Sequence, residues 1–294
     1  MQQIKLLPRK VLIILAIIIL LPAQACATEN KKPFPEKINA ERALYKSMMK
    51  LSPSCTMRFV LPTDISTEYI NNLTSLGQSL YQIDNGVNGC KGDFASYSLY
   101  NGGVIYKSSS IKHSQLHLTL REELKYKVTK AQQKAYVTKK QKVLKKLRLS
   151  KKSGQAAKYN NVKKIYSWVT KNVNYDYSTK KSSAYNALID HQSTCVGCAA
   201  LFYDLCRDSG IPCRIIIGYT DTIRDGTHAW NIVRVGKKWY NCDPTWDEET
   251  RYRKYFLKGN ARFSKNHIPY NRFTTKSFKA KFPVSSKDYA SGSK

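Results

Sequence analysis

Acidic residues are scarce in this sequence. Among its 294 residues, 20 Asp and Glu stand against 50 Lys and Arg, and the formal net charge is +30 at pH 7. No Asp or Glu occurs between Leu124 and Tyr175, where lysines follow in close order. A positive field of this kind attracts polyanions at long range. A solvated helix face that keeps the protein soluble explains the same pattern, so both interpretations stay open.

A long hydrophobic run is also missing. The apolar run from Val11 to Leu21 has 11 residues, which is too few to span a bilayer. Basic residues precede this run and the small residues of Ala23-Gln24-Ala25 follow it, which is the order of a secretory signal peptide. We therefore expect residues 1–25 to be a signal peptide and the mature chain to be secreted or extracytoplasmic. An uncleaved anchor is the main alternative.

The eight cysteines lack the two paired clusters that a zinc finger needs. Cys26 directly follows Ala25, and AQAC resembles a bacterial lipoprotein box, so lipid anchoring to the membrane at Cys26 competes with ordinary cleavage. Export also permits disulfide bonds. Cys55 and Cys90 are the other two cysteines of the N-terminal half, and we expect them to pair unless they are simply buried apolar residues.

Recognised nucleic-acid-binding modules and aromatic platforms are absent from the basic stretch. We therefore expect no nucleic-acid partner. For an exported chain, an anionic cell-wall polymer or lipid surface is the more natural partner.

The N-terminal half predicts a small α+β prefix region over residues 28–150. Its expected elements are a strand with alternating Met57, Phe59 and Leu61, a helix around 69–81, short strands at 104–106 and 116–120, and a basic helix over 131–149. After a flexible joint at 150–155, a second helix carries an apolar stripe at helical spacing, formed by Val162, Ile165, Tyr166, Val169 and Val173.

A third helix brings a reactive thiol. Thr194 is a good N-cap, so Cys195 lies in the first turn of a helix that ends near Gly210. Backbone N–H groups and the helix dipole stabilise a thiolate there and lower the pKa of the thiol. Gly197 is costly inside a helix and indicates the close approach of another backbone or of a substrate.

A hairpin brings a base and its partner. Cys213 to Tyr219 is an apolar strand, and residues 227–242 read as a hairpin that turns at Gly236-Lys237. In that register Val235 pairs with Lys238, and His228 and Asp243 are diagonal neighbours on one face. Asp243 would then fix the tautomer of His228 while the other ring nitrogen faces Cys195.

The segments TCVGCA, GYTDTIRDGTHAWN and KWYNCDPTW resemble the transglutaminase-like (transglutaminase/protease-like) superfamily, and the likeness extends over about 162–267. It implies an α+β, papain-like fold over residues 156–275, followed by a basic tail at 276–294. It also implies a catalytic triad of Cys195, His228 and Asp243. Cys198 stands where the superfamily usually has an aromatic residue. His267 lies at a position associated with the superfamily, and the sequence gives it no role.

Other chemistry stays open at this point. Cys195 and Cys198 form a C-x-x-C pair, so a redox site and Cys198 as the nucleophile are two alternatives. We favour Cys195 as the nucleophile over both. A zinc site would draw on Cys195, Cys198, Cys206, His228 or Cys242, but we expect neither metal nor cofactor. His191 is expected to be a surface residue, and Trp230 and Trp246 to pack beside the triad.

The sequence predicts a cysteine peptidase or amidase that acts by acyl transfer on a peptide or protein. Cross-linking of glutamine to lysine uses the same triad and is the first alternative. A non-catalytic module that binds the cell envelope through the basic helix is the second. Hydrolysis is favoured because the chain shows no calcium-loop carboxylates or accessory domains of the animal cross-linking enzymes.

Overall fold

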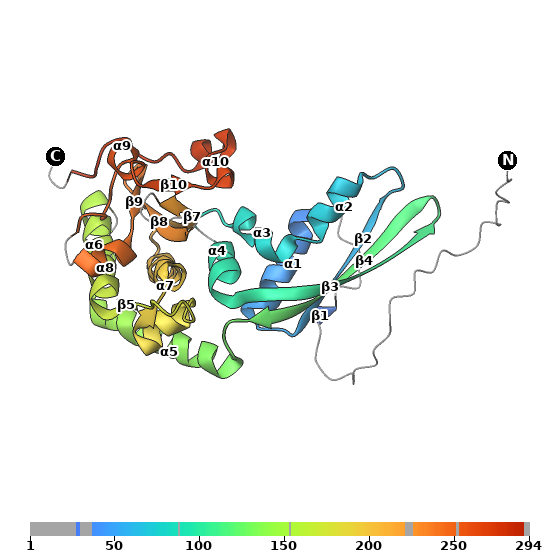
Figure 1. Ribbon diagram of the computed structural model, residues 1–294, viewed down its shortest axis with the longest axis horizontal. Helices are drawn as coiled ribbons and strands as arrows, with labels where there is room; N and C mark the ends of the chain where they lie inside the picture. Colours follow the sequence, from blue (N-terminus) through green and yellow to red (C-terminus); the bar gives the residue numbers. More distant parts are fainter. Residues whose placement is uncertain are drawn as a thin grey trace.

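A computed structural model describes residues 28–29, 37–87, 89–152, 154–220, 226–250 and 253–290. The expected signal peptide and Cys26 lie outside these residues. No helix in the described ranges is long and apolar enough to cross a bilayer. The described residues form two four-stranded sheets, one in the N-terminal half and one in the C-terminal half (Figure 1), and a small two-stranded sheet.

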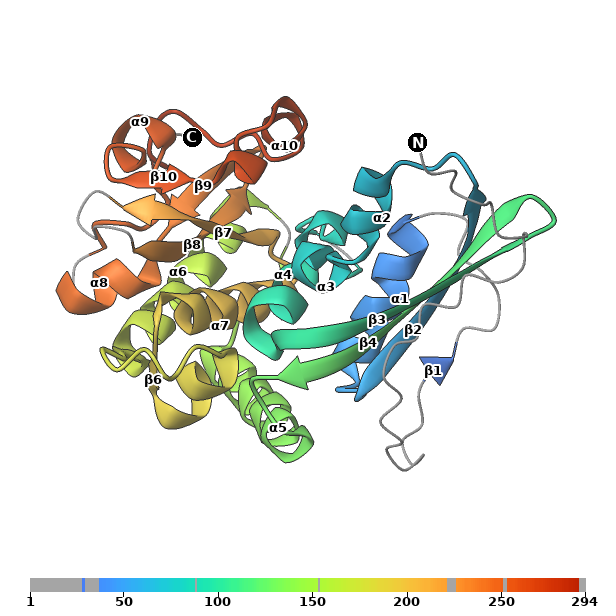
Figure 2. The same cartoon turned by 45° about the vertical axis from the view of Figure 1, so that its right-hand side comes forward.

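The N-terminal sheet has the strand order β1-β2-β4-β3. Its strands are β1 (Thr28–Glu29), β2 (Ser54–Pro62), β3 (Tyr100–Lys112) and β4 (Gln115–Tyr126). The predicted alternation in β2 is confirmed, because Met57, Phe59 and Leu61 are buried. They pack with Leu44 and Met48 of α1 (Lys37–Met49) in one apolar cluster. The two short strands expected at 104–106 and 116–120 are parts of a much longer hairpin, which extends away from the C-terminal half (Figure 2).

Short helices connect this sheet to the rest of the chain. The helix expected over 69–81 is broken at Thr74–Ser75 into separate pieces. These connecting elements are α2 (Thr67–Leu73), α3 (Leu76–Ser79), the 3-10 helix η1 (Leu80–Ile83), α4 (Gly92–Phe94) and the π-helix η2 (Ala95–Leu99). The expected bond between Cys55 and Cys90 is wrong, since both are free. Cys55 points from β2 toward the Ser47 hydroxyl, while Cys90 lies near Arg42 in the loop before α4.

Two long helices follow as predicted. The basic helix α5 (Lys130–Leu147) starts with a capping box formed by Thr129 and Gln132. Tyr136 and Val143 of α5 are buried in the C-terminal cluster, so the basic helix packs with the C-terminal half. In α6 (Gln155–Asn172) the apolar stripe is buried as expected.

The C-terminal sheet has the order β10-β7-β8-β9, and α7 packs between this sheet and α6 (Figure 1). The remaining elements are β5 (Asn174–Tyr175), the π-helix η3 (Asn186–Asp190), β6 (Gln192–Ser193), α7 (Cys195–Asp208), β7 (Cys213–Thr220), β8 (Thr227–Val235), β9 (Lys238–Cys242), α8 (Pro244–Thr250), α9 (Asn260–Phe263), β10 (His267–Pro269), the 3-10 helix η4 (Asn271–Phe273) and α10 (Lys276–Lys281). The fold is α+β, as expected. The segment predicted as a basic tail forms α10 and then runs beside β9, where Trp239 pairs with Val284.

Buried ion pairs join the two halves. Arg214 of β7 donates from Nε and Nη2 to the two carboxylate oxygens of Asp93, at 2.8 and 3.0 Å. Arg207 of α7 donates to Asp84 at 2.7 Å. The four side chains are at most 2 % exposed, so the halves are held together by charges that water does not reach.

Candidate active site

Cys195 begins helix α7, as predicted. Thr194 occupies the N-cap position, and its carbonyl accepts the Cys198 N–H at 3.1 Å, but its hydroxyl makes no capping bond. The Cys195 side chain is 5 % exposed and belongs to the C-terminal core. The thiol therefore lies at the positive end of the helix dipole.

Gly197 lets the start of α7 pack tightly, as expected from its place in a helix. A Cβ at this position would lie 2.0 Å from the Ser193 hydroxyl oxygen and 2.6 Å from the carbonyl oxygen of Ser183. The approaching group is therefore the backbone and side chain of the segment just upstream. This contact fixes the turn that carries Cys195.

His228 and Asp243 form the predicted hydrogen bond. His228 Nε2 lies 2.7 Å from Asp243 Oδ2. Val235 pairs with Lys238 as predicted, but the ladder between β8 and β9 ends at Asn231 and Cys242. Asp243 therefore lies just beyond β9, where its N–H donates to the Tyr255 carbonyl. The diagonal contact was predicted correctly, although the strand ends earlier than the prediction assumed.

The three predicted residues interact electrostatically. Burial lowers the pKa of His228, but the charge of Asp243, its hydrogen bond and a hydrogen bond with the Cys195 side chain raise it to about 10. For Asp243, burial raises the pKa of the carboxyl group. The neighbouring imidazoles outweigh this effect, His228 more than His267, and bring the pKa of Asp243 below its usual value. Since His228 Nε2 faces Asp243, the remaining nitrogen Nδ1 faces the thiol. The arrangement favours the imidazolium form of His228 between Asp243 and the Cys195 side chain.

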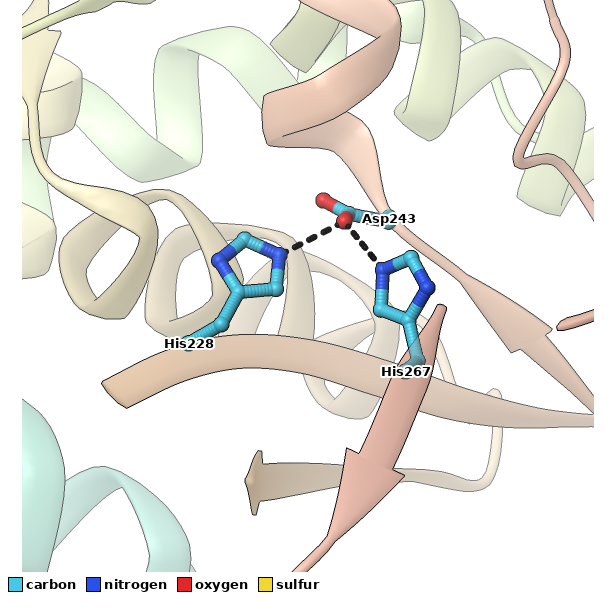
Figure 3. A group of neighbouring side chains, drawn as sticks. All are labelled: His228, Asp243 and His267. Atoms are coloured by element: carbon cyan, nitrogen blue, oxygen red, sulfur yellow. Dashed lines mark hydrogen bonds and ion pairs between the residues drawn. The ribbon is translucent and has the colours of Figure 1, made fainter. Parts of the chain in front are cut away.

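A second histidine contacts Asp243. His267 of β10 places Nε2 3.0 Å from the same oxygen, Asp243 Oδ2, so both imidazoles point at one carboxylate oxygen (Figure 3). The other oxygen, Oδ1, accepts the N–H groups of Thr245 and Trp246 at 3.0 and 3.2 Å. Asp243 is fully buried, and these contacts fix its orientation. No spacing rule links His267 to Asp243, because β10 reaches the sheet after a long connection.

Aromatic rings enclose the histidines. Trp246 is tilted over His228 at 5.3 Å between centroids, and Trp230 lies 6.1 Å from it. Phe263 stacks on His267 at 3.8 Å. Trp230 and Trp246 therefore pack beside the site, as predicted. Such rings exclude water and strengthen the charge interactions inside.

Cys198 differs from Cys195 in its surroundings. Full burial in the core raises the pKa of Cys198 far above its ordinary value, so this thiol stays protonated. The imidazole of His228 interacts with Cys195. The geometry therefore favours Cys195 over Cys198 as a nucleophile. His191 is exposed, as expected, and its Nδ1 lies 2.8 Å from the Asn172 carbonyl oxygen.

Metal ligands come together at one place in the described chain. His228, Asp243 and His267 each offer a ligand atom within 4.8 Å of the others. This set differs from the cysteine-rich set considered for zinc, because none of its three members is a cysteine. The oxygens of Asp243 already accept four hydrogen bonds, which accounts for the arrangement without a metal.

Residues 145–244 match the sequence profile of the transglutaminase-like superfamily. This part of the chain, 100 residues long, is therefore transglutaminase-like. The matched range holds Cys195, His228 and Asp243, and it ends before His267. The fold, with a cysteine-bearing helix packed on an antiparallel sheet, agrees with that assignment.

Curated relatives are the kyphoscoliosis peptidases of Mus musculus and Homo sapiens. Each is 28% identical over 137 residues, covering 38% of this chain and 21% of the relative. The chain thus spans about a fifth of the length of the curated relatives it matches. Among solved structures, a TGase overlaps 65% of this chain and 51% of its own, at 14% identity and a TM-score of 0.34. A candidate cysteine protease from Cytophaga hutchinsonii overlaps 48% and 62%, at 16% identity and a TM-score of 0.30.

Proposed function

We propose that this transglutaminase-like chain is a cysteine peptidase or amidase that acts by acyl transfer. Cys195 is the nucleophile, His228 the acid and base, and Asp243 the residue that orients His228. The observation that carries the proposal is the buried His228–Asp243 hydrogen bond of 2.7 Å, whose imidazole also bonds the Cys195 side chain. The substrate is a peptide or protein.

The first half of the reaction cleaves the amide. The Cys195 thiolate attacks the carbonyl carbon, a C–S bond forms, and the oxygen becomes an oxyanion near the Cys195 N–H. His228 then gives its proton to the nitrogen as the C–N bond breaks. The amine leaves, and the acyl group remains on Cys195 as a thioester.

The second half regenerates the thiol. His228 takes a proton from water, and the hydroxide attacks the thioester carbonyl carbon. The C–S bond breaks, the carboxylic acid leaves, and Cys195 returns as the thiolate beside protonated His228. If a lysine amine attacks in place of water, the product is an isopeptide bond, which is the cross-linking alternative.

The alkylation rate of each cysteine against pH tests the triad. In the wild type we expect Cys195 to react well below the ordinary thiol pKa of about 8.5. Cys198 should be slow, because its thiol is fully buried. His228→Ala should abolish the early reactivity of Cys195. An unreactive Cys195, or a faster Cys198, would overturn the assignment.

Product analysis separates hydrolysis from cross-linking. Peptides that contain Gln and Lys are incubated with the enzyme and read by mass spectrometry, with Cys195→Ala as the control. New termini indicate a peptidase. Ammonia release with isopeptide formation and no cleavage would replace the hydrolase version by the cross-linking one.

Export is part of the proposal and rests on the pattern of residues 1–25. We expect the mature chain to begin near Cys26 outside the cytoplasm. The mass and N-terminal sequence of the chain from its native host test this, and a lipid on Cys26 would identify an anchored form. A mature protein that still begins with Met1 would argue against processing.

A further inference from the structure

A groove lies along the outer side of α6, between this helix and the end of α5. It has a volume of about 910 Å³. Its wall follows α6 from Ala157 to Asn172, which is about 22 Å at 1.5 Å per residue. Trp168 is half-buried within it. A groove of this length fits an extended chain better than a single small ion.

The groove is lined by cations from three parts of the chain. They are Lys146, Arg148, Lys152, Lys163, Lys164, Lys171 and Arg253. No Asp or Glu lines it, and none of these cations forms an ion pair with a carboxylate in the described residues. Clustered like charges repel one another, and an anionic ligand would relieve that repulsion.

Some of these cations are held in place by uncharged groups. Lys164 Nζ donates to the Arg148 carbonyl at 3.0 Å, and Arg253 donates to the Ser167 hydroxyl at 3.0 Å. Asn161 fixes the turn between the helices, because it bonds both the N–H and the carbonyl of Ser150 at 2.8 Å. These bonds fix the shape of the groove and two of its cations.

The groove is separate from the proposed catalytic residues. The inner side of α6 holds Tyr166, whose hydroxyl donates to the Asp243 carbonyl at 2.7 Å. The outer side carries the cations. Helix α6 thus stands between the groove and the triad, and neither Cys195 nor His228 lines the groove. A ligand in the groove would leave the triad open.

We propose that this groove is a binding site for a linear polyanion whose repeated phosphate or carboxylate groups run along α6. Five of its seven cations are lysines, which act as mobile point charges rather than as bidentate readers of one anion. Recognition by charge density along a flexible chain follows from this composition. The site would hold the enzyme on an anionic polymer while its triad faces other substrate.

Binding of long-chain polyphosphate to the full chain, measured against salt concentration, tests the site. Lys146, Lys152 and Lys171 make no side-chain bond to any other described residue, so K146Q/K152Q/K171Q should fold normally. We expect this variant to bind on the order of tenfold more weakly at low salt, with a shallower dependence on salt. The matched control K276Q/K279Q/K281Q removes three exposed charges from α10 and should change affinity less than threefold.

Other probes identify the chemistry. Poly-L-glutamate binding alongside polyphosphate would support recognition of charge density, and polyphosphate binding alone would support a phosphate-bearing polymer. Equal losses of polyphosphate affinity in the two triple variants would overturn the proposed site, because the net charge of the protein alone would then explain binding. Tighter binding of oligo(dT) that is lost in Trp168→Ala would overturn it in favour of a nucleic-acid site. Cys195→Ala should bind polyphosphate like the wild type, so this test is independent of the triad.

Discussion

At the scale of single residues, Asp243 is the most constrained group of the site. Its oxygens accept two imidazole N–H groups and two backbone N–H groups while the side chain is out of contact with water. A hydrogen bond to a charged group contributes about 1.5–3 kcal/mol. In the proposed mechanism His267 is a positioning residue, which would act on the chemistry through Asp243 and His228.

Substitution of His267 should separate this role from simple packing. His267→Phe keeps an aromatic ring but removes the donor, and we expect the rate of Cys195 alkylation near neutral pH to fall about tenfold or more. The rate should rise only at higher pH, as in an ordinary thiol. His267→Gln can still donate to Asp243 and should restore most of the reactivity. Equal losses in the two variants would indicate a packing role alone.

The pKa of His228 predicts how stability changes with pH. The folded-state pKa is raised from 6.5 to about 10, so this contribution is complete below pH 6.5 and is lost as pH rises toward 10. We expect the stability difference between wild type and His228→Gln to narrow over this window, by up to about 1.4 kcal/mol per pH unit. Urea unfolding at pH 6, 8 and 10 measures it. A constant difference would contradict the shift.

The three candidate residues could be found from the sequence because each stands at a recognisable end of an element. Cys195 follows an N-cap residue, and the hairpin register brings His228 near Asp243. His267 could not be given a role, because its partner lies 24 residues away and no local pattern joins them. A bond between Cys55 and Cys90 was expected only because the N-terminal half offers no other partner for either. In the fold the two thiols lie in different surroundings.

At the scale of elements, the start of α7 depends on the absence of a side chain at Gly197. Gly197→Ala would bring its Cβ within 2.0 Å of the Ser193 hydroxyl oxygen and 2.6 Å of a carbonyl oxygen. We expect a loss of stability of about 1–3 kcal/mol, typical of overpacking, with slower alkylation of Cys195. Val196→Ala, which removes atoms at the neighbouring half-buried position, is the control. Thermal unfolding and alkylation measure both variants, and a neutral Gly197→Ala would refute the close contact.

Elements with strong periodicity were predicted well. The apolar residues of α6 recur at helical spacing, so they lie on one side only when the segment is a helix, and that side is then buried. The hairpin β3–β4 was underestimated, because β3 is exposed along nearly its whole length and shows no alternation of burial. The break between α2 and α3 was missed, since Thr74 and Ser75 carry no proline or glycine signal.

At the scale of the whole molecule, buried charges join the two halves. Burial raises the pKa of Asp93 to about 6 even beside Arg214, which shows how costly its charge is there. Arg214→Met removes the cation, and we expect a loss of about 3–5 kcal/mol in the free energy of unfolding. Asp93→Asn in the same chain should recover part of it. Urea unfolding followed by circular dichroism measures these values.

The exposed pair of Arg121 and Glu123 is the matched control. Its atoms lie 3.7 Å apart, and the side chains are 57% and 38% exposed. Arg121→Met should change stability by less than about 0.5 kcal/mol. If Arg214→Met lowered the free energy of unfolding by no more than this, the buried ion pairs between the halves would not be a source of stability.

The buried ion pairs between the halves also decide which part of the chain can fold by itself. Arg207 and Arg214 belong to α7 and β7, the helix that carries Cys195 and the strand next to His228, yet their counter-ions Asp84 and Asp93 come from the N-terminal half. A polypeptide that begins at residue 145, where the superfamily match starts, would keep two buried guanidinium groups and lose both carboxylates. The segment that matches the superfamily is therefore shorter than the part of the chain that can fold by itself. Expression of residues 145–294 alone should give insoluble protein unless both arginines are replaced by apolar side chains.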